Sequence, residues 1–243
     1  MLFNSGTTTN SIVYRLNRNT GANNTIYPLA DKASDVNEGL DKYWHLAMVG
    51  SGTWQIDDSN QTDLPISTAD LVSGQQDYTL PSDLMIIEKI FAKDSGGSWN
   101  ELAPVDITQT QEDLGAKNIW ILPSGNSGSP TKYDKKANSI FLDPIPNYNS
   151  TSGLKISFKR GPSYIISSDT TKAPGIPSIH HPYLVDYATW VYLGSKLSNQ
   201  SLIAKYNVLT IKLANWEKTI KEYYAYRPAD EKKRLIPLRE YNR

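Results

Sequence analysis

Residues 202–223 read LIAKYNVLTIKLANWEKTIKEY, and they form the longest regular element that the sequence predicts. Large apolar residues recur at alternating spacings of four and three, which places them on one face of a helix about six turns long. They are Leu202, Tyr206, Leu209, Leu213, Trp216, Ile220 and Tyr223. We expect the face from Tyr206 to Tyr223 to pack on the helix's own domain; the alternative is that part of it contacts a neighbouring subunit.

Three further segments have helical patterns. Residues 184–193 are apolar nearly all round, which is typical of a helix buried between other elements. Residues 31–48 place Ala33, Val36, Leu40, Tyr43 and Ala47 on one face. Asp31 is suited to cap the start of that helix, and Gly50 and Gly52 to end it. Residues 8–18 are expected to form a short first helix.

Between the N- and C-terminal helical segments, from residue 53 to 162, apolar residues tend to recur at every second position, as in strands. Residues 84–93 predict a strand, and Gly96 and Gly97 predict the tight turn after it. Leu154, Ile156 and Phe158 alternate with polar residues and predict a half-buried strand. Residues 106–114 are expected to form a short helix.

The order of these elements predicts an α+β fold, in which a bundle of N- and C-terminal helices holds a β-rich insertion. The expected boundaries are residues 1–52 and 163–226 for the helical bundle and residues 53–162 for the β-rich part. Residues 227–243 are expected to form an extended basic C-terminal tail.

Composition excludes several classes of function. The 243 residues include no cysteine, so disulfides, thiolate metal sites and a cysteine nucleophile are absent. Lys and Arg number 25, as do Asp and Glu, so the net charge gives no general reason to bind nucleic acid. A neutral chain is also weakly protected against self-association, which suits a protein that assembles. No apolar run predicts a membrane-spanning helix, and we expect no signal peptide.

No motif predicts an active site or a metal site. His45 lies in a helix, and His180 and His181 precede the buried helix, where a role at the helix start or in an interface is expected. Asp57 and Asp58 are interpreted as part of a solvated loop, because nothing places two carboxylates across a cleft. Phosphate-binding, dinucleotide-binding and nucleophile-elbow motifs are missing. We therefore expect a protein that is not an enzyme, with no catalytic residue, no cofactor and no metal.

An ordered set of short segments resembles the head–tail adaptor (connector, or head-completion) proteins of tailed bacteriophages. The segments are QQDYTLPSD (75–83), LMIIEKI (84–90), WNEL (99–102), PVD (104–106), IFLDPIP (140–146) and IPSIHHPYL (176–184). Each segment taken alone is only a common strand or turn pattern. The resemblance depends on the order of the segments, which extends over roughly residues 30–225.

The resemblance implies a structural virion protein that forms a homo-oligomeric, dodecameric ring beneath the portal, at the neck between head and tail. The ring is assembled in the host cytoplasm, binds the portal protein and a downstream tail or neck protein, and continues the DNA channel. DNA passes through without sequence-specific binding, and no membrane is involved. The family has no catalytic residues that could be assigned to positions of this sequence.

The C-terminal tail is the segment that the resemblance links to the portal, because several adaptors order such a tail against it. The basic residues expected to dock are Arg227, Lys232, Lys233, Arg234, Arg239 and Arg243, with Leu235, Ile236, Leu238 and Tyr241 as apolar anchors. The alternative is an ordinary solvated tail.

Other functions stay open at this point. One is a tail-side completion protein, and another is a hydrolase with an unrecognised site. A third is a carbohydrate- or surface-binding β-rich module, which the 15 Tyr and 6 Trp would suit. The long apolar face of residues 202–223 favours assembly over sugar binding.

Overall fold

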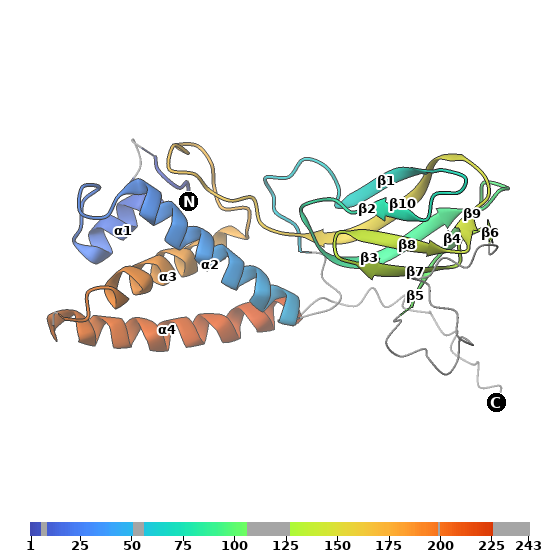
Figure 1. Cartoon of the computed structure of the whole chain (residues 1–243). Helices are drawn as coiled ribbons and strands as arrows, with labels where there is room; N and C mark the ends of the chain where they lie inside the picture. The colour runs from blue at the N-terminus through green and yellow to red at the C-terminus, as the bar shows by residue number, and fades with distance from the viewer. Residues whose placement is uncertain (6–8, 51–55, 106–126, 199, 226–243) are drawn as a thin grey trace, which may run out of the picture. The chain divides into compact units, whose positions relative to one another are not determined.

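The computed structural model describes residues 1–5, 9–50, 56–105, 127–198 and 200–225, drawn in colour in Figure 1. These residues form four α-helices, one short 3-10 helix and ten strands, so the predicted α+β class is confirmed. The chain divides into two compact units. The helical unit comprises Met1–Ile56, Ile165–Lys172 and Pro177–Arg243, and the β unit comprises Asp57–Tyr164 and Ala173–Ile176.

The first helix begins later than its sequence pattern suggests. Helix α1 (Ile12–Thr20) has Ser11 as its N-cap, whose side chain accepts a hydrogen bond from the Tyr14 amide at 3.2 Å. Gly21 ends the helix with a φ of 72°, which a residue without a side chain adopts easily. The predicted range of 8–18 is therefore wrong at both ends, because the cap at Ser11 and the glycine set the boundaries.

Three longer helices complete the helical unit: α2 (Leu29–Gly50), α3 (His181–Gly194), which follows the 3-10 turn η1 (Ser178–His180), and α4 (Gln200–Ala225). Helix α3 contacts each of the other three, and α2 also packs on α4. Asp31 lies in the first turn of α2 rather than at its cap. At the other end, a Cβ on Gly50 would lie 2.8 Å from the Lys221 carbonyl oxygen, so glycine permits the close approach of α2 to α4.

The β unit contains two four-stranded sheets and a short parallel pair. The first sheet is antiparallel, in the order β1 (Ile66–Leu71), β10 (Ser150–Arg160), β3 (Leu84–Lys93), β4 (Trp99–Glu101). The second has the order β2 (Asp77–Thr79), β8 (Ser139–Asp143), β7 (Lys132–Lys136), β5 (Ala103–Pro104), with β5 and β7 parallel. The parallel pair is β6 (Ser127–Gly128) with β9 (Ile145–Pro146).

Side chains from both four-stranded sheets share one apolar core. Its buried members are Leu71, Tyr78, Leu80, Ile90, Ala92, Leu102, Ile140, Leu142, Leu154, Ile156 and Phe158. The predicted alternation of Leu154, Ile156 and Phe158 is confirmed, because all three point into this core. The predicted strand over 84–93 coincides with β3, and Gly97 forms the following turn with a φ of 86°. The helix expected over 106–114 lies outside the described residues.

Candidate functional site

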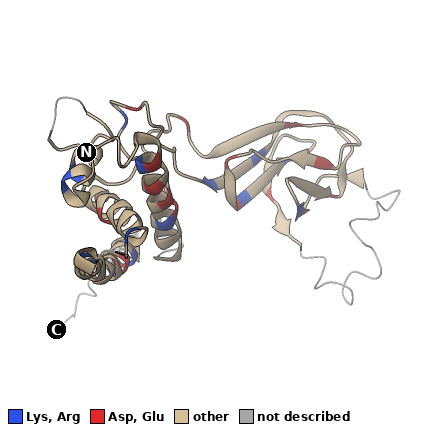
Figure 2. Ribbon diagram, turned by 60° about the vertical axis from the view of Figure 1, so that its left-hand side comes forward, with Lys and Arg blue, Asp and Glu red and all other residues tan. Residues whose placement is uncertain are grey.

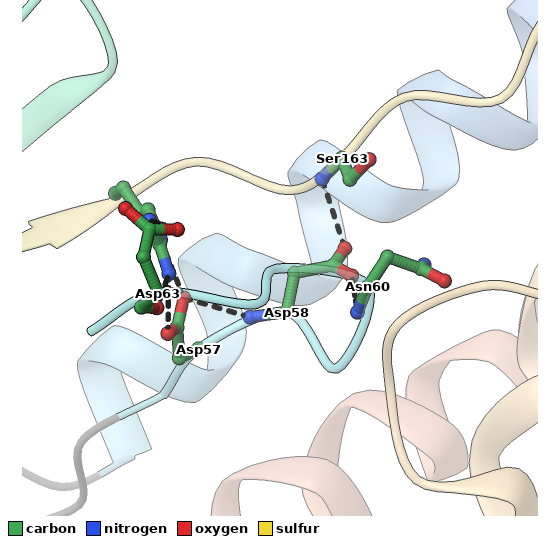
Figure 3. A network of polar contacts seen from close by, with 6 residues as sticks. Asp57, Asp58, Asn60, Asp63 and Ser163 are labelled. Carbon is green, nitrogen blue, oxygen red and sulfur yellow. Dashed lines mark hydrogen bonds and ion pairs between the residues drawn. The ribbon is translucent and has the colours of Figure 1, made fainter. Parts of the chain in front are cut away.

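A polar network is built where β10 ends (Figure 3). Arg160, the last residue of β10, is only 3% exposed. Its guanidinium binds both carboxylate oxygens of Asp57, with Nε–Oδ1 and Nη2–Oδ2 distances of 2.9 Å, and Nη1 reaches Asp63 at 3.0 Å. A planar guanidinium and a carboxylate match in such a two-bond arrangement, which is why arginine suits this position.

Strand geometry explains why a charge is buried here. Alternation along β10 places Phe158 and Arg160 on the buried side of the strand, so the guanidinium needs acidic partners close by. The hydrogen bonds to Asp57 raise the pKa of Arg160 above its already high value. Arg160 in turn lowers the pKa of the Asp63 carboxyl. Both shifts favour the charged forms of Arg160 and Asp63.

Asp58 belongs to the same network and is 2% exposed. Its carboxylate accepts hydrogen bonds from the backbone amides of Asn60 at 2.8 Å and Ser163 at 2.9 Å. Gly175 packs directly against it, since a Cβ there would lie 1.6 Å from Asp58 Oδ1, and the Gly175 carbonyl accepts from the Ser59 amide. The interpretation of Asp57 and Asp58 as a solvated loop is wrong, because a buried arginine and backbone amides hold both carboxylates.

This network has a structural rather than a catalytic arrangement. The Asp57 and Asp58 carboxylates face cationic or amide donors and do not face each other across an open space. They bring together three segments of the β unit: residues 57–63, 160–163 and 173–175. Sequence reasoning missed this because Arg160 and Asp57 lie 103 positions apart. The sequence signal for this network is Arg160 itself, which falls at an inward-facing position of a strand whose apolar and polar residues alternate.

The two adjacent histidines lie at the start of α3, as expected. His180 Nδ1 is hydrogen-bonded to the Tyr43 hydroxyl at 2.6 Å, and the His180 ring packs edge-on against Tyr223 and Trp216. Burial lowers the pKa of His180, so the ring is neutral at neutral pH. His45 is exposed on α2. Within the described ranges, no group of three or more His, Cys, Asp or Glu residues is arranged to hold a metal ion.

The long apolar face predicted over residues 202–223 lies on α4. Leu209, Leu213 and Ile220 are buried within the helical unit, where α4 packs on α2 and α3. Tyr206 stacks on Trp190 with ring centroids 5.5 Å apart. Trp216 Nε1 donates to Asp186 Oδ2 at 3.0 Å, while Tyr223 is 39% exposed. The predicted portal-docking residues, from Arg227 to Arg243, lie outside the described residues.

Sequence reasoning also missed a second apolar feature of α4. Val208 and Ile211 are 64% and 66% exposed and lie outside the buried row of the helix. Their spacing of three is a helical signal, but they fall between the positions of the predicted apolar face.

The fold and these contacts define an α+β protein in which the polar network around Arg160 supports the architecture of the β unit. None of the helices in the described part of the chain has the length and apolar character needed to span a bilayer.

A comparison with protein families matches residues 18–231 to the family described as SU10 adaptor protein. The chain belongs to this family of phage head–tail adaptors. It is therefore a structural component of a phage virion, with a role implied to be non-enzymatic and to involve other head or tail proteins. No curated protein matches the chain.

Proposed function

We propose that this chain forms a dodecameric ring beneath the portal, where it joins the phage head to the tail and continues the DNA channel. The observation that carries the proposal is the family match over residues 18–231. A ring of identical subunits needs two different, complementary patches on each copy and a rotation that closes. A chain with helical and β units has separate surfaces for such neighbours and for the proteins above and below the ring.

The parts of the chain are assigned different roles in this proposal. The helices of residues 1–52 and 163–226 act as one bundle that carries the subunit contacts. The β-rich part, residues 53–162, faces a neighbouring head or tail protein, and the tail of residues 227–243 docks on the portal through its basic and apolar residues. Because the chain has equal numbers of acidic and basic residues, the ring lets DNA pass without holding its phosphates strongly.

One surface feature bears on the carbohydrate-binding alternative. Trp99 is 42% exposed on β4, the kind of ring on which a sugar could stack. Lys93 and Lys155 lie over that ring, with amino groups 5.0 and 5.5 Å from its centroid. These lysine contacts compete with a stacked sugar, so Trp99 does not favour a sugar-binding module.

The experiment is a phage in which the gene for this chain is silenced. The expected product is DNA-filled heads without tails, to which the purified chain restores tail attachment. Image reconstruction of the complemented particles should then show the ring density between portal and tail. Tailed, infectious particles formed in the absence of the chain, or a density for it elsewhere in the virion, would overturn the proposal.

A further inference from the structure

The outward face of α4 combines exposed aliphatic side chains with basic ones. Val208 and Ile211 project from it, 64% and 66% exposed. Lys205, Lys212 and Lys218 are exposed on the same stretch of helix, one to ten positions from these two residues. Lys205 also donates to the Asn19 carbonyl, and Lys218 pairs with Glu222 at 3.8 Å. Lys212 also pairs with Asp186 at 2.7 Å, yet its side chain stays 51% exposed. We call this set of five residues the basic face of α4.

The outward face of α2 has the opposite charge. Asp31, Glu38 and Asp41 are exposed at helical spacings of seven and three, so they lie along one side of the helix. Asp35 flanks them and is half-buried, and Val49 follows at the end of the helix, 61% exposed. Figure 2 shows red acidic bands along this helix together with blue basic ones. Lys42, which follows Asp41, pairs with Glu217 of α4 at 3.6 Å. We call the three exposed acids, Asp35 and Val49 the acidic face of α2.

The two faces point away from the helical unit in different directions. Helices α2 and α4 pack on each other and both pack on α3, so each turns its buried row towards the other two helices. The acidic and the basic face lie outside these buried rows, on the surface of the helical unit, although Glu38 accepts a hydrogen bond from Tyr187 and Lys212 pairs with Asp186, both on α3. One subunit therefore carries two separate patches of opposite charge, although its net charge is zero.

We propose that the acidic face of α2 docks on the basic face of α4 of a second copy of this chain. Opposite charge steers such a contact and sets its register, while burial of Val208 and Ile211 removes apolar surface from water. Two different patches make the contact head-to-tail, which allows it to repeat around a ring. The binding partner is a second copy of this chain, because each copy carries both an acidic face and a basic face. The inference rests on the proposed ring and names the subunit surfaces that build it.

Cysteine cross-linking tests the contact directly, because the chain has no cysteine of its own. One full-length copy carries Val208→Cys, and a second, distinguished by a size tag, carries Glu38→Cys. Both positions are exposed, so the buried rows stay intact, and Glu38→Cys removes only the hydrogen bond that Glu38 accepts from the Tyr187 hydroxyl. The matched control replaces Glu38→Cys by Lys135→Cys, an exposed position on β7 of the β unit.

Under mild oxidation, we expect the Val208–Glu38 mixed disulfide to form at least about tenfold faster than the control pair. It should also form faster than the disulfide between two Val208→Cys copies. Equal rates for the mixed pair and the control would overturn the proposal. Faster self-coupling of Val208→Cys would also overturn it, because that result indicates a two-fold contact in which α4 meets α4.

Charge reversal provides an independent test of the same surfaces. Copies with Asp31→Lys and Glu38→Lys, or with Lys205→Glu and Lys218→Glu, should each lose the cross-link and self-assembly when alone. A mixture of the two reversed proteins restores opposite charges at every contact, so assembly should return. Assembly of either variant alone to the wild-type extent would contradict the proposal.

The phage assay separates this inference from the ring itself. If the reversed variants attach tails as well as the wild type does, only the assigned surfaces are wrong. If the wild-type chain fails to restore tails, the proposed function fails.

Discussion

At the scale of single residues, Arg160 matters because its charge is buried and paired. We expect Arg160→Met to destabilise the β unit by about 3 kcal/mol, since it leaves the Asp57 carboxylate without its cation. Urea unfolding followed by tryptophan fluorescence would measure the loss. The double variant with Asp57→Asn should be less destabilised than the single variant, because no unpaired carboxylate remains.

The matched control is Asp63→Asn, which removes the other acid that contacts Arg160. The Asp63 side chain is 74% exposed, so this change should alter the free energy of unfolding far less than Arg160→Met does. If Arg160→Met changed stability no more than Asp63→Asn does, the buried pair would not stabilise the β unit.

His180 makes the stability of the helical unit dependent on pH. Its pKa is lowered by burial and by His181, and its Nε2 has no hydrogen-bond partner in the described part of the chain. The unfolded chain therefore binds a proton more readily than the folded one, so stability is full above the ordinary pKa of 6.5 and falls as pH drops below it.

The test compares the pH dependence of wild type with that of His180→Asn, which keeps a hydrogen-bonding group near Tyr43 but cannot titrate. Between about pH 6.5 and about pH 5, the variant should show a shallower slope, by at most about 1.4 kcal/mol per pH unit. Parallel slopes for His180→Asn and wild type would show that His180 is not the group responsible.

At the scale of elements, α4 has two apolar sides with different expected roles. Ile220 is fully buried, so Ile220→Ala should cost about 3 kcal/mol through lost apolar burial and the cavity left behind. Val208 is 64% exposed, and Val208→Ala should change the stability of the subunit by less than about 0.5 kcal/mol. Chemical denaturation followed by circular dichroism at dilute concentration would compare them; equal losses would mean that both sides of α4 pack within one subunit.

At the scale of the whole molecule, the tail of residues 227–243 is predicted to dock on the portal. Deleting residues 228–243 should leave the subunit folded, as judged by its unfolding midpoint, and should abolish its attachment to DNA-filled heads. For the full-length chain, attachment should weaken towards 1 M salt, because the Debye length there is only about 3 Å. A truncated protein that joins heads as well as the full chain does would identify the tail as merely solvated.

Local periodicity in the sequence is enough to predict several features of this fold. The spacing of Leu209, Leu213 and Ile220 predicts the buried row of α4, and the alternation of Leu154, Ile156 and Phe158 predicts the inward side of β10. Together they indicate an α+β chain, and the order of short motifs indicates the adaptor family before any contact is known. Such features depend on neighbours within a few residues, so a single segment is enough to predict them.

The partners of distant polar groups become known only from the folded structure. Asp57 and Asp58 look like solvated acids until the fold brings Arg160, from 103 positions away, and the Ser163 amide beside them. The exposed sides of α2 and α4 likewise become separate acidic and basic faces only once both helices pack against α3. Burial and charge pairing depend on which segments meet in space, and a periodic pattern along one segment does not specify its partner.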